Sequence, residues 1–101
     1  MHYYAFICED AENVLEKRKA VRPAHLARLE SLAAENRVLA AGPLMNQDGE
    51  NPILTGIHGS LIIAKFNSLS EAKAWIAADP FVTAEVYKRI TVKPFNVVLP
   101  V

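Results

Sequence analysis

The 101-residue sequence predicts an α+β fold, with one antiparallel sheet that carries its helices on a single face. Four segments have the apolar, β-rich composition of strands, and two have the periodicity of helices. Their order is strand, helix, strand, strand, helix, strand, which is the ferredoxin-like βαββαβ arrangement. The length and the balance of 51% hydrophobic to 22% charged residues predict one globular domain over residues 1–101.

The strands are predicted from three kinds of pattern. The first and third are aromatic or apolar, the second is a short apolar segment that Gly42-Pro43 should close, and the last alternates polar and apolar residues. A long loop rich in Asn, Gly and Pro should join the second strand to the third over residues 44–59. We therefore expect strands at residues 3–8, 38–41, 60–66 and 88–93.

The helices are predicted from apolar spacing and capping residues. Apolar residues recur at helical spacing between Val14 and Ala33, in a helical segment that should reach about Asn36, but Pro23 interrupts it. Proline either kinks a helix or occupies its first turn, so we expect two helical pieces in this stretch. Ser68 and Glu71 form a capping box, which predicts a further helix over residues 69–78.

The charge balance argues against several classes of function. Eleven basic residues balance eleven acidic ones, without the cationic excess of a general nucleic-acid binder or of a protein held electrostatically on a membrane. We find no apolar run near the ~20 residues of a membrane span and no signal-peptide pattern. Cys8, the single cysteine, lies in an apolar run and is expected in the core, which favours a reduced, cytoplasmic protein.

Both faces of the predicted sheet are apolar. Residues 5–7 and 61–64 lack the alternating polar side chains that a water-exposed face would show. Large exposed apolar surfaces usually mark contacts. We therefore expect a second copy of the chain to stack sheet on sheet and form a homodimer.

Three ionisable residues interrupt the apolar face of the first helical segment. Arg18, Arg22 and His25 fall within the arc formed by its apolar residues. Unpaired charge is costly to bury, so each of them needs a partner, an opening to solvent or a ligand. The stretch from Arg18 to His25 is therefore the best candidate for chemistry.

His25 and Asp79 each have two interpretations. If Pro23 begins a helix, His25 lies in its first turn, where the helix dipole would keep the imidazole neutral and ready to act as a base. The alternative is a partly buried histidine bonded to a backbone carbonyl. Asp79 either caps a helix begun by Pro80 or reaches His25 and fixes the tautomer of its ring. The residues alone favour capping.

The two arginines also have two interpretations. One could pair with a carboxylate, that of Glu9, Asp10 or Asp79, and the other could bind an anionic substrate group. Alternatively, their stems pack on the core while the charged heads reach water. We favour this alternative for Arg18 and treat the two interpretations as equal for Arg22.

Gly42, Pro43 and Ser60 flank the predicted loop and are candidate ligand-binding residues. Glycine lets backbone approach a ligand, and Ser60 could donate to a bound group, but all three are also ordinary turn or strand-end residues. We expect His2 and His58 in solvent. The histidines lack the spacing of metal ligands, and a phosphate-binding glycine motif is missing, so we expect neither a metal nor another cofactor.

A series of short motifs runs through nearly the whole chain. In order, the motifs are Arg22-Pro23-Ala24-His25-Leu26, Leu29, Ala41-Gly42-Pro43, Gly59-Ser60, Ala78-Asp79-Pro80-Phe81 and Val92-Lys93-Pro94-Phe95. In this combination the chain resembles the YciI-like family. The resemblance implies a dimeric α/β barrel of ferredoxin-like protomers, and it maps the family's histidine–aspartate pair onto His25 and Asp79. The family includes a chlorohydroxyhydroquinone dehydrochlorinase, for which the resemblance implies acid–base work by this pair on an aromatic substrate.

These observations lead to two main functional hypotheses. The first is a cofactor-free lyase or isomerase in which His25 moves a proton on a phenolic or enolisable small molecule. Asp79 would orient the ring, and Arg22 would anchor a negative group. The second is a non-catalytic module that binds a metabolite or assembles as a dimer. A third interpretation makes His25 and Asp79 a purely structural pair.

Overall fold

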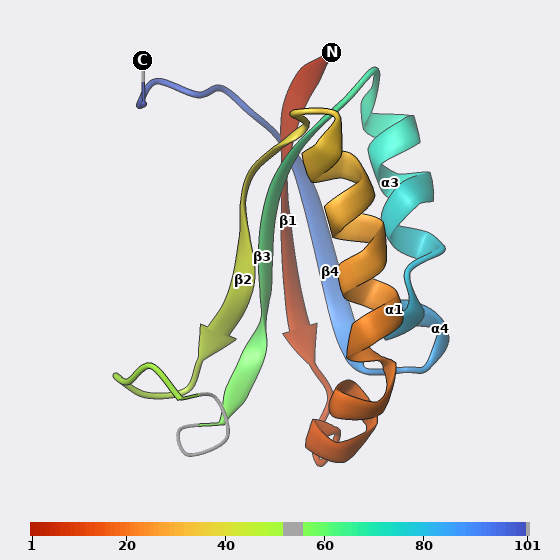
Figure 1. Ribbon diagram of the computed structural model, residues 1–101, viewed down its shortest axis with the longest axis vertical. Helices are drawn as coiled ribbons and strands as arrows, with labels where there is room; N and C mark the ends of the chain where they lie inside the picture. The colour runs from red at the N-terminus through yellow and green to blue at the C-terminus, as the bar shows by residue number, and fades with distance from the viewer. Residues whose placement is uncertain (52–55, 101) are drawn as a thin grey trace.

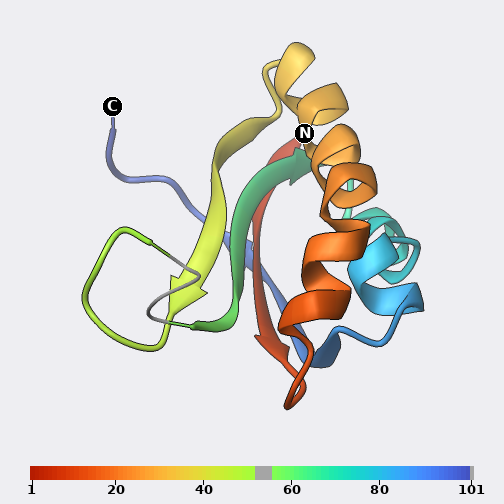
Figure 2. The same cartoon turned by 60° about the horizontal axis from the view of Figure 1, so that its bottom comes forward.

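The computed structural model describes residues 1–51 and 56–100 and has the predicted ferredoxin-like fold. The strands form one antiparallel sheet in the order β2-β3-β1-β4, and the helices lie together on one face of it (Figure 1, Figure 2). In chain order the elements are β1 (His2–Asp10), α1 (Leu15–Ala34), β2 (Val38–Met45), β3 (Ile57–Phe66), α3 (Leu69–Ala77), α4 (Pro80–Thr83) and β4 (Tyr87–Phe95).

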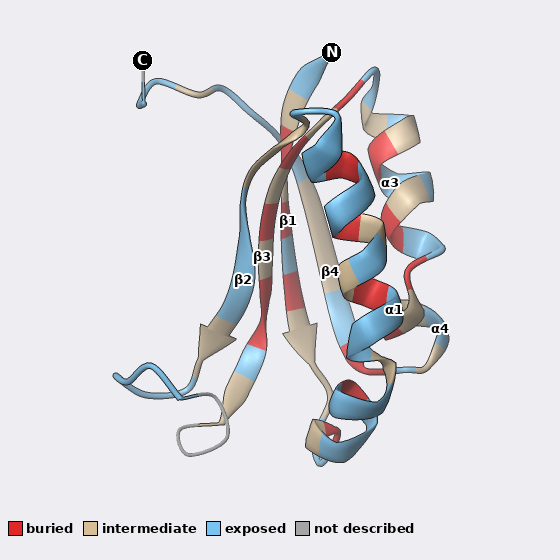
Figure 3. Ribbon diagram, viewed as in Figure 1, coloured by how far each residue is buried: buried red, intermediate tan, exposed pale blue. Residues whose placement is uncertain are grey.

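The core lies between the two central strands and the helices. Alternate residues of β1 and β3 point toward the helices, as the period of two in a strand requires. Figure 3 shows that the buried residues of α1 follow one side of the helix. The main contributors are Tyr4, Phe6, Cys8, Leu29, Leu32, Ile62, Ala64, Phe66, Ala72 and Ile76, all buried.

The helix predicted from the capping box is confirmed. The hydroxyl of Ser68 accepts a hydrogen bond from the backbone N–H of Glu71 at 3.0 Å, and α3 follows directly. A short helix, α4, begins at Pro80 with Asp79 as its cap. The order of elements therefore positions Asp79 between two helices on the covered face of the sheet.

The prediction of two helical pieces around Pro23 is wrong, because α1 is one continuous helix. Proline deprives the carbonyl of Lys19, four residues earlier, of its helical donor. Both residues are exposed, so water can supply that hydrogen bond and the helix continues. His25 consequently lies in the interior of a helix, and the argument that a helix N-terminus keeps its ring neutral does not hold.

Gly42 and Pro43 do not end the second strand as predicted, since β2 continues to Met45. β2 is an edge strand, where a proline without an N–H can be tolerated. Pro94 lies in β4, the opposite edge, for the same reason. The connection from β2 to β3 is correspondingly shorter than expected and includes residues 52–55, which lie outside the described residues.

Gly59 in β3 is required by close contact between strands. A Cβ at this position would collide with the backbone carbonyl of Cys8 in β1. Glycine therefore allows β1 and β3 to pair at the end of the sheet nearest the candidate site.

Candidate functional site

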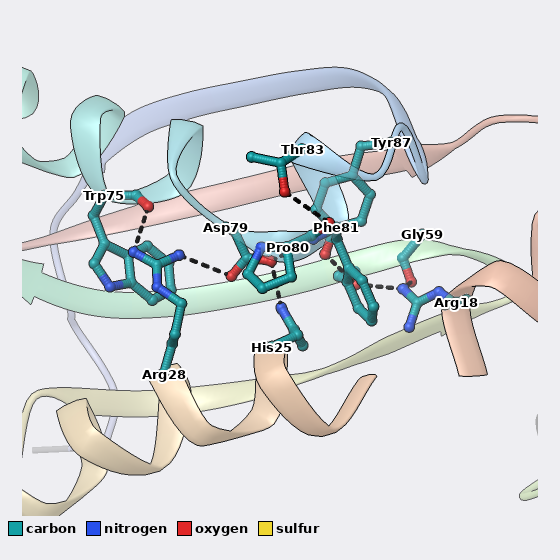
Figure 4. Close-up of polar contacts among 11 residues, drawn as sticks. Arg18, His25, Arg28, Gly59, Trp75, Asp79, Pro80, Phe81, Thr83 and Tyr87 are labelled. Atoms are coloured by element: carbon teal, nitrogen blue, oxygen red, sulfur yellow. Dashed lines mark hydrogen bonds and ion pairs between the residues drawn. The ribbon is translucent and has the colours of Figure 1, made fainter. Parts of the chain in front are cut away.

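The fold brings His25 and Asp79 into contact across 54 positions of sequence. His25 projects from α1, and its Nδ1 lies 2.8 Å from Oδ1 of Asp79 (Figure 4). The two side chains are 9% and 0% exposed. The same Oδ1 accepts the backbone N–H of Phe81 at 2.9 Å, so Asp79 caps α4 and contacts the imidazole with one oxygen.

Arg28, which the sequence analysis missed, holds the second oxygen of Asp79. Its Nη1 donates to Oδ2 at 3.0 Å, and its Nη2 donates to the carbonyl of Trp75 at 2.8 Å (Figure 4). The guanidinium also lies over the indole of Trp75, with Cζ 4.6 Å from the ring centroid. Arg28 follows His25 by one helical turn, and this spacing was the available signal for it.

These contacts fix the tautomer of the His25 ring. A guanidinium and a backbone N–H can only donate, so Asp79 is an acceptor at both oxygens and Nδ1 of His25 must donate to it. In the neutral imidazole the lone pair then lies on Nε2, which has no hydrogen-bond partner among the described residues. The ring stacks on Phe81, with centroids 4.0 Å apart and planes at 17°. The contacts with Asp79 and Phe81 therefore fix both the tautomer of the neutral ring and its orientation.

A cavity of about 660 Å³ lies between α1 and the strands β2 and β3. Its size falls within the usual range for small-molecule sites. Leu26, Leu29 and Ile62 are among its apolar lining residues, and the cationic residues Arg18, Lys19 and Arg22 of α1 line it as well. None of the eight residues of β2, all of which the structure describes, is buried (Figure 3). Part of the inner face of this strand therefore borders the cavity and is not covered by packed side chains.

The predicted site residues other than Asp79 line this cavity. They are Arg22, His25, Gly42, Pro43 and Ser60. Arg22 is exposed and has no hydrogen bond or ion pair with any described residue. A Cβ at Gly42 would meet nothing within 4 Å, so this glycine borders open space. The structure gives these residues a common location, and their roles stay predictions.

Arg18 is buried, and the prediction that its charged head reaches water is wrong. Its side chain is 7% exposed, and its Nε donates to Oδ2 of Asp10 at 2.8 Å. Its Nη2 donates to the hydroxyl of Ser60 at 2.6 Å and to the carbonyl of Gly59 at 3.2 Å. The guanidinium lies 4.6 Å from the centroid of Phe81. A buried charge is tolerated here because a carboxylate and neutral acceptors surround it.

Tyr87 completes this buried network and was also missed. Its hydroxyl donates to Oγ of Ser60 at 2.8 Å. Burial raises the pKa of the Tyr87 phenol well above its ordinary value, so the group stays protonated and remains a donor. Burial, with a smaller contribution from the charge of Asp79, raises the pKa of the neighbouring Cys8 thiol to about 12. The thiol is therefore unsuited to act as a nucleophile near neutral pH.

Two kinds of feature were not found in residues 1–51 and 56–100. No three His, Cys, Asp or Glu side chains gather there as a metal site would need. No helix in those ranges is both long and apolar enough to cross a membrane.

Proteins of similar sequence match nearly the whole chain. The chain is 53% identical over 94 residues to an uncharacterized protein of Haemophilus influenzae, covering 93% of this chain and 96% of the relative. It is 50% identical over 93 residues to Protein YciI of Escherichia coli, covering 92% and 95%.

A solved structure shares the fold. The 5-chloro-2-hydroxyhydroquinone dehydrochlorinase of Burkholderia phenoliruptrix, in complex with 2,5-dihydroxybenzoquinone, is similar with a TM-score of 0.83 over 93% of both chains. The two sequences are 24% identical, so the likeness concerns the fold alone. The family model of the YCII-related domain matches residues 2–96. This match and the two relatives confirm the resemblance predicted from the motifs, and the chain belongs to the YCII-related family.

Proposed function

We propose that this protein is a cofactor-free lyase or isomerase in which Nε2 of His25 moves a proton on a phenolic or enolisable small molecule. The observation that carries the proposal is the buried contact of 2.8 Å between His25 Nδ1 and Asp79, in a ring that lines a cavity of ligand size. A carboxylate on one ring nitrogen orients the imidazole and leaves the other nitrogen to act as the base.

The proposed reaction uses side chains of this chain alone. An O–H of the ligand gives its proton to Nε2 and keeps the electron pair as a phenolate, or a C–H next to a carbonyl gives its proton and the bonding electrons move to the carbonyl oxygen, which becomes an enolate. The carboxylate of Asp79 stabilises the imidazolium, while Arg28 and the N–H of Phe81 keep that carboxylate in place. The proton then returns at another atom in an isomerisation, or an anionic leaving group departs in an elimination.

The cavity and a protein of the same fold support this ligand class. The dehydrochlorinase was solved with 2,5-dihydroxybenzoquinone, a planar ring that carries ionisable hydroxyl groups. In this chain, apolar side chains of α1 and β3 can contact the faces of such a ring. Arg22, which lines the cavity and is unpaired among the described residues, would bind an anionic group of the ligand.

Replacement of His25 tests the proposal. Wild-type protein should accelerate exchange of the ring hydrogens of 2,5-dihydroxybenzoquinone in D₂O, in which a ring carbon takes up a deuteron to form the keto tautomer and then loses its proton to Nε2. NMR follows the exchange. His25→Ala should reduce that acceleration ~10²–10⁴-fold, which is the usual contribution of a positioned acid or base. His58→Ala is the matched control, because His58 is exposed and lies outside the residues that line the cavity. Circular dichroism checks that each variant is folded.

The alternatives give different results in this assay. Full exchange activity in folded His25→Ala would reject the mechanism. A wild-type protein that binds the quinone without exchanging its hydrogens would support the non-catalytic binding module instead.

We also propose that the protein forms a homodimer through the open face of its sheet. The helices of the described part of the chain lie on the other face (Figure 2). The open face carries the apolar residues that alternate with the buried ones: Tyr3, Ala5, Ile7, Leu61 and Ile63. Ile7, on a central strand, is 43% exposed. Stacking of two copies about a twofold axis would remove this patch from water.

A charge in the centre of this patch should dissociate the dimer. Ile7→Glu should give a monomer by light scattering where the wild type gives a dimer, because a stacked interface would bury two unpaired carboxylates. Ala74→Glu adds the same charge at an exposed position of α3 and should leave the dimer intact. A monomeric wild-type protein at micromolar concentration would contradict the proposal.

A further inference from the structure

We propose that Ser60 and Arg18 form an oxyanion site in the wall of the cavity, which binds a phenolate or enolate oxygen of the ligand. The inference rests on the proposed function for the nature of the ligand and extends it by assigning the groups that receive the negative charge. It is carried by the hydrogen bonds around Oγ of Ser60.

With Tyr87 as the donor in its contact with Ser60, the hydrogen of the Ser60 hydroxyl has no acceptor among the described residues. Its oxygen receives one hydrogen bond from Nη2 of Arg18 at 2.6 Å and one from the hydroxyl of Tyr87 at 2.8 Å. A hydroxyl oxygen accepts two hydrogen bonds and donates one, so both lone pairs are occupied and the O–H remains. Ser60 is 3% exposed and lines the cavity. A buried donor normally has an acceptor, so we expect a ligand in the cavity to accept a hydrogen bond from this O–H.

Arg18 has unused donors next to that hydroxyl. Its Nε is committed to Asp10, and its Nη2 to Gly59 and Ser60. Its Nη1 has no hydrogen-bond partner among the described residues, and the side chain lines the same cavity. The wall of the cavity thus has an O–H donor and N–H donors on two groups that are bonded to each other. Fixed donors of this kind stabilise negative charge that develops on an oxygen.

The guanidinium also strengthens the serine hydroxyl as a donor. A hydrogen bond from a cation to Oγ polarises the O–H, because bonds in a chain reinforce one another in a low-dielectric setting. Asp10 offsets the charge of Arg18 through its contact at Nε, whereas Ser60 is bonded to Nη2. Ser60 and Arg18 can therefore remain buried when no ligand is bound. When a ligand is bound, they still favour an anionic ligand oxygen over a neutral one.

Phe81 contacts both Arg18 of the oxyanion site and His25, the proposed base. The ring of His25 lies 4.0 Å from the centroid of Phe81, and Cζ of Arg18 lies 4.6 Å from the same centroid. Figure 4 shows His25 and Arg18 projecting from α1 toward Phe81. Both side chains also line the cavity, so one ligand in it can lie against both. The ligand atom that loses its proton and the ligand oxygen that takes up the negative charge would be conjugated through the ring of the ligand.

Binding of a nitrophenol tests the oxyanion site without any turnover. The probe is 4-nitrophenol, whose phenol and phenolate forms absorb differently and interconvert near neutral pH, and 4-nitroanisole is the analogue that cannot ionise. Wild-type protein should bind the phenolate form in preference, seen as a fall in the apparent pKa of the bound probe. Ser60→Ala should weaken phenolate binding roughly 10- to 100-fold, as expected for a hydrogen bond to a charged group, and leave 4-nitroanisole binding unchanged.

Three variants keep this test decisive. Ser60→Thr retains the hydroxyl and should retain the phenolate preference, while Ser60→Cys has nearly the same shape with a weak donor and should lose it. Ser31→Ala removes an exposed hydroxyl of α1 and should change nothing. A folded Ser60→Ala or Ser60→Cys variant with the wild-type preference would overturn the inference. A wild-type protein that binds neither probe, or binds both equally, would also overturn it.

The same probe separates this inference from the proposed function. His25→Ala should keep the phenolate preference, because the donors lie on Ser60 and Arg18. If that preference persists while His25→Ala retains full hydrogen exchange, the acid–base mechanism fails and the oxyanion site stands. If the phenolate preference is absent in the wild type and in every variant while His25→Ala abolishes hydrogen exchange, the oxyanion site fails and the acid–base mechanism stands.

Discussion

Asp79→Ala should lower the free energy of unfolding by about 3 kcal/mol, a large part of the roughly 5–15 kcal/mol that stabilises a domain of this size. The carboxylate is 0% exposed and accepts from three donors. Its loss leaves Nδ1 of His25 and the N–H of Phe81 without acceptors. Arg28, which is 26% exposed, can turn toward water, and this keeps the expected loss near the lower end of the range for broken buried pairs. Urea denaturation measures the change.

Asp79→Asn separates the structural role of this side chain from its effect on the imidazole. The amide keeps the shape of the side chain and one acceptor, so it should cost less stability than alanine. Its NH₂ group, however, can donate to Nδ1 of His25 and move the ring proton to Nε2, which then faces the cavity as a donor. The wrong tautomer removes the base, and exchange of the quinone hydrogens should fall by up to ~10⁴-fold.

Asp48→Asn, at an exposed position outside the cavity lining, is the control for this substitution. Wild-type exchange in a folded Asp79→Asn protein would show that the tautomer does not matter. Loss of stability without loss of exchange in both variants would make His25 and Asp79 the purely structural pair.

Arg18→Met should cost about 3–5 kcal/mol of unfolding free energy. The substitution preserves an unbranched stem but leaves the carboxylate of Asp10 without its cation. That side chain is 5% exposed, and its Oδ1 already has no hydrogen-bond partner among the described residues. An unpaired buried charge of this kind is among the most costly changes a core can suffer. Urea denaturation again provides the measurement.

A second substitution and a surface pair provide the controls for Arg18→Met. Asp10→Asn in the Arg18→Met background removes the stranded charge and should restore part of the stability, so a double-mutant cycle should show strong coupling. Arg89→Met breaks an ion pair with Glu9 in which the arginine is 70% exposed, and it should cost no more than about 1 kcal/mol. Equal effects of the two arginine substitutions would contradict the burial argument.

The order of elements could be predicted because each depends on local patterns. The capping box of Ser68 and Glu71 is a contact within one helical turn, and it is confirmed. The errors at Pro23 and Pro43 have a common cause. Whether a chain tolerates proline depends on whether the missing N–H faces water, and this is a property of the assembled sheet and helix layer rather than of neighbouring residues.

Only some of the site residues could be predicted from the sequence, because most of their contacts join segments that are distant in the chain. Arg18 and His25 stood out because they interrupt an apolar face, but the partner of Arg18 comes from the end of β1 and could be narrowed only to three carboxylates. Tyr87 gave no signal, since its contact with Ser60 joins strands β3 and β4, which are not neighbours in the sheet. For Asp79 the capping and imidazole interpretations were posed as rivals, whereas one oxygen serves both.

The uncovered inner face of β2 means that an occupant of the cavity would act as a missing part of the hydrophobic core. A ligand there would supply the apolar contacts that the strand does not receive from the chain itself. Folding and occupancy are then linked, so that a compound at one hundred times its dissociation constant would add about 2.7 kcal/mol to the stability of the protein. A rise in the unfolding temperature when a compound is added can therefore identify the natural ligand before its reaction is known.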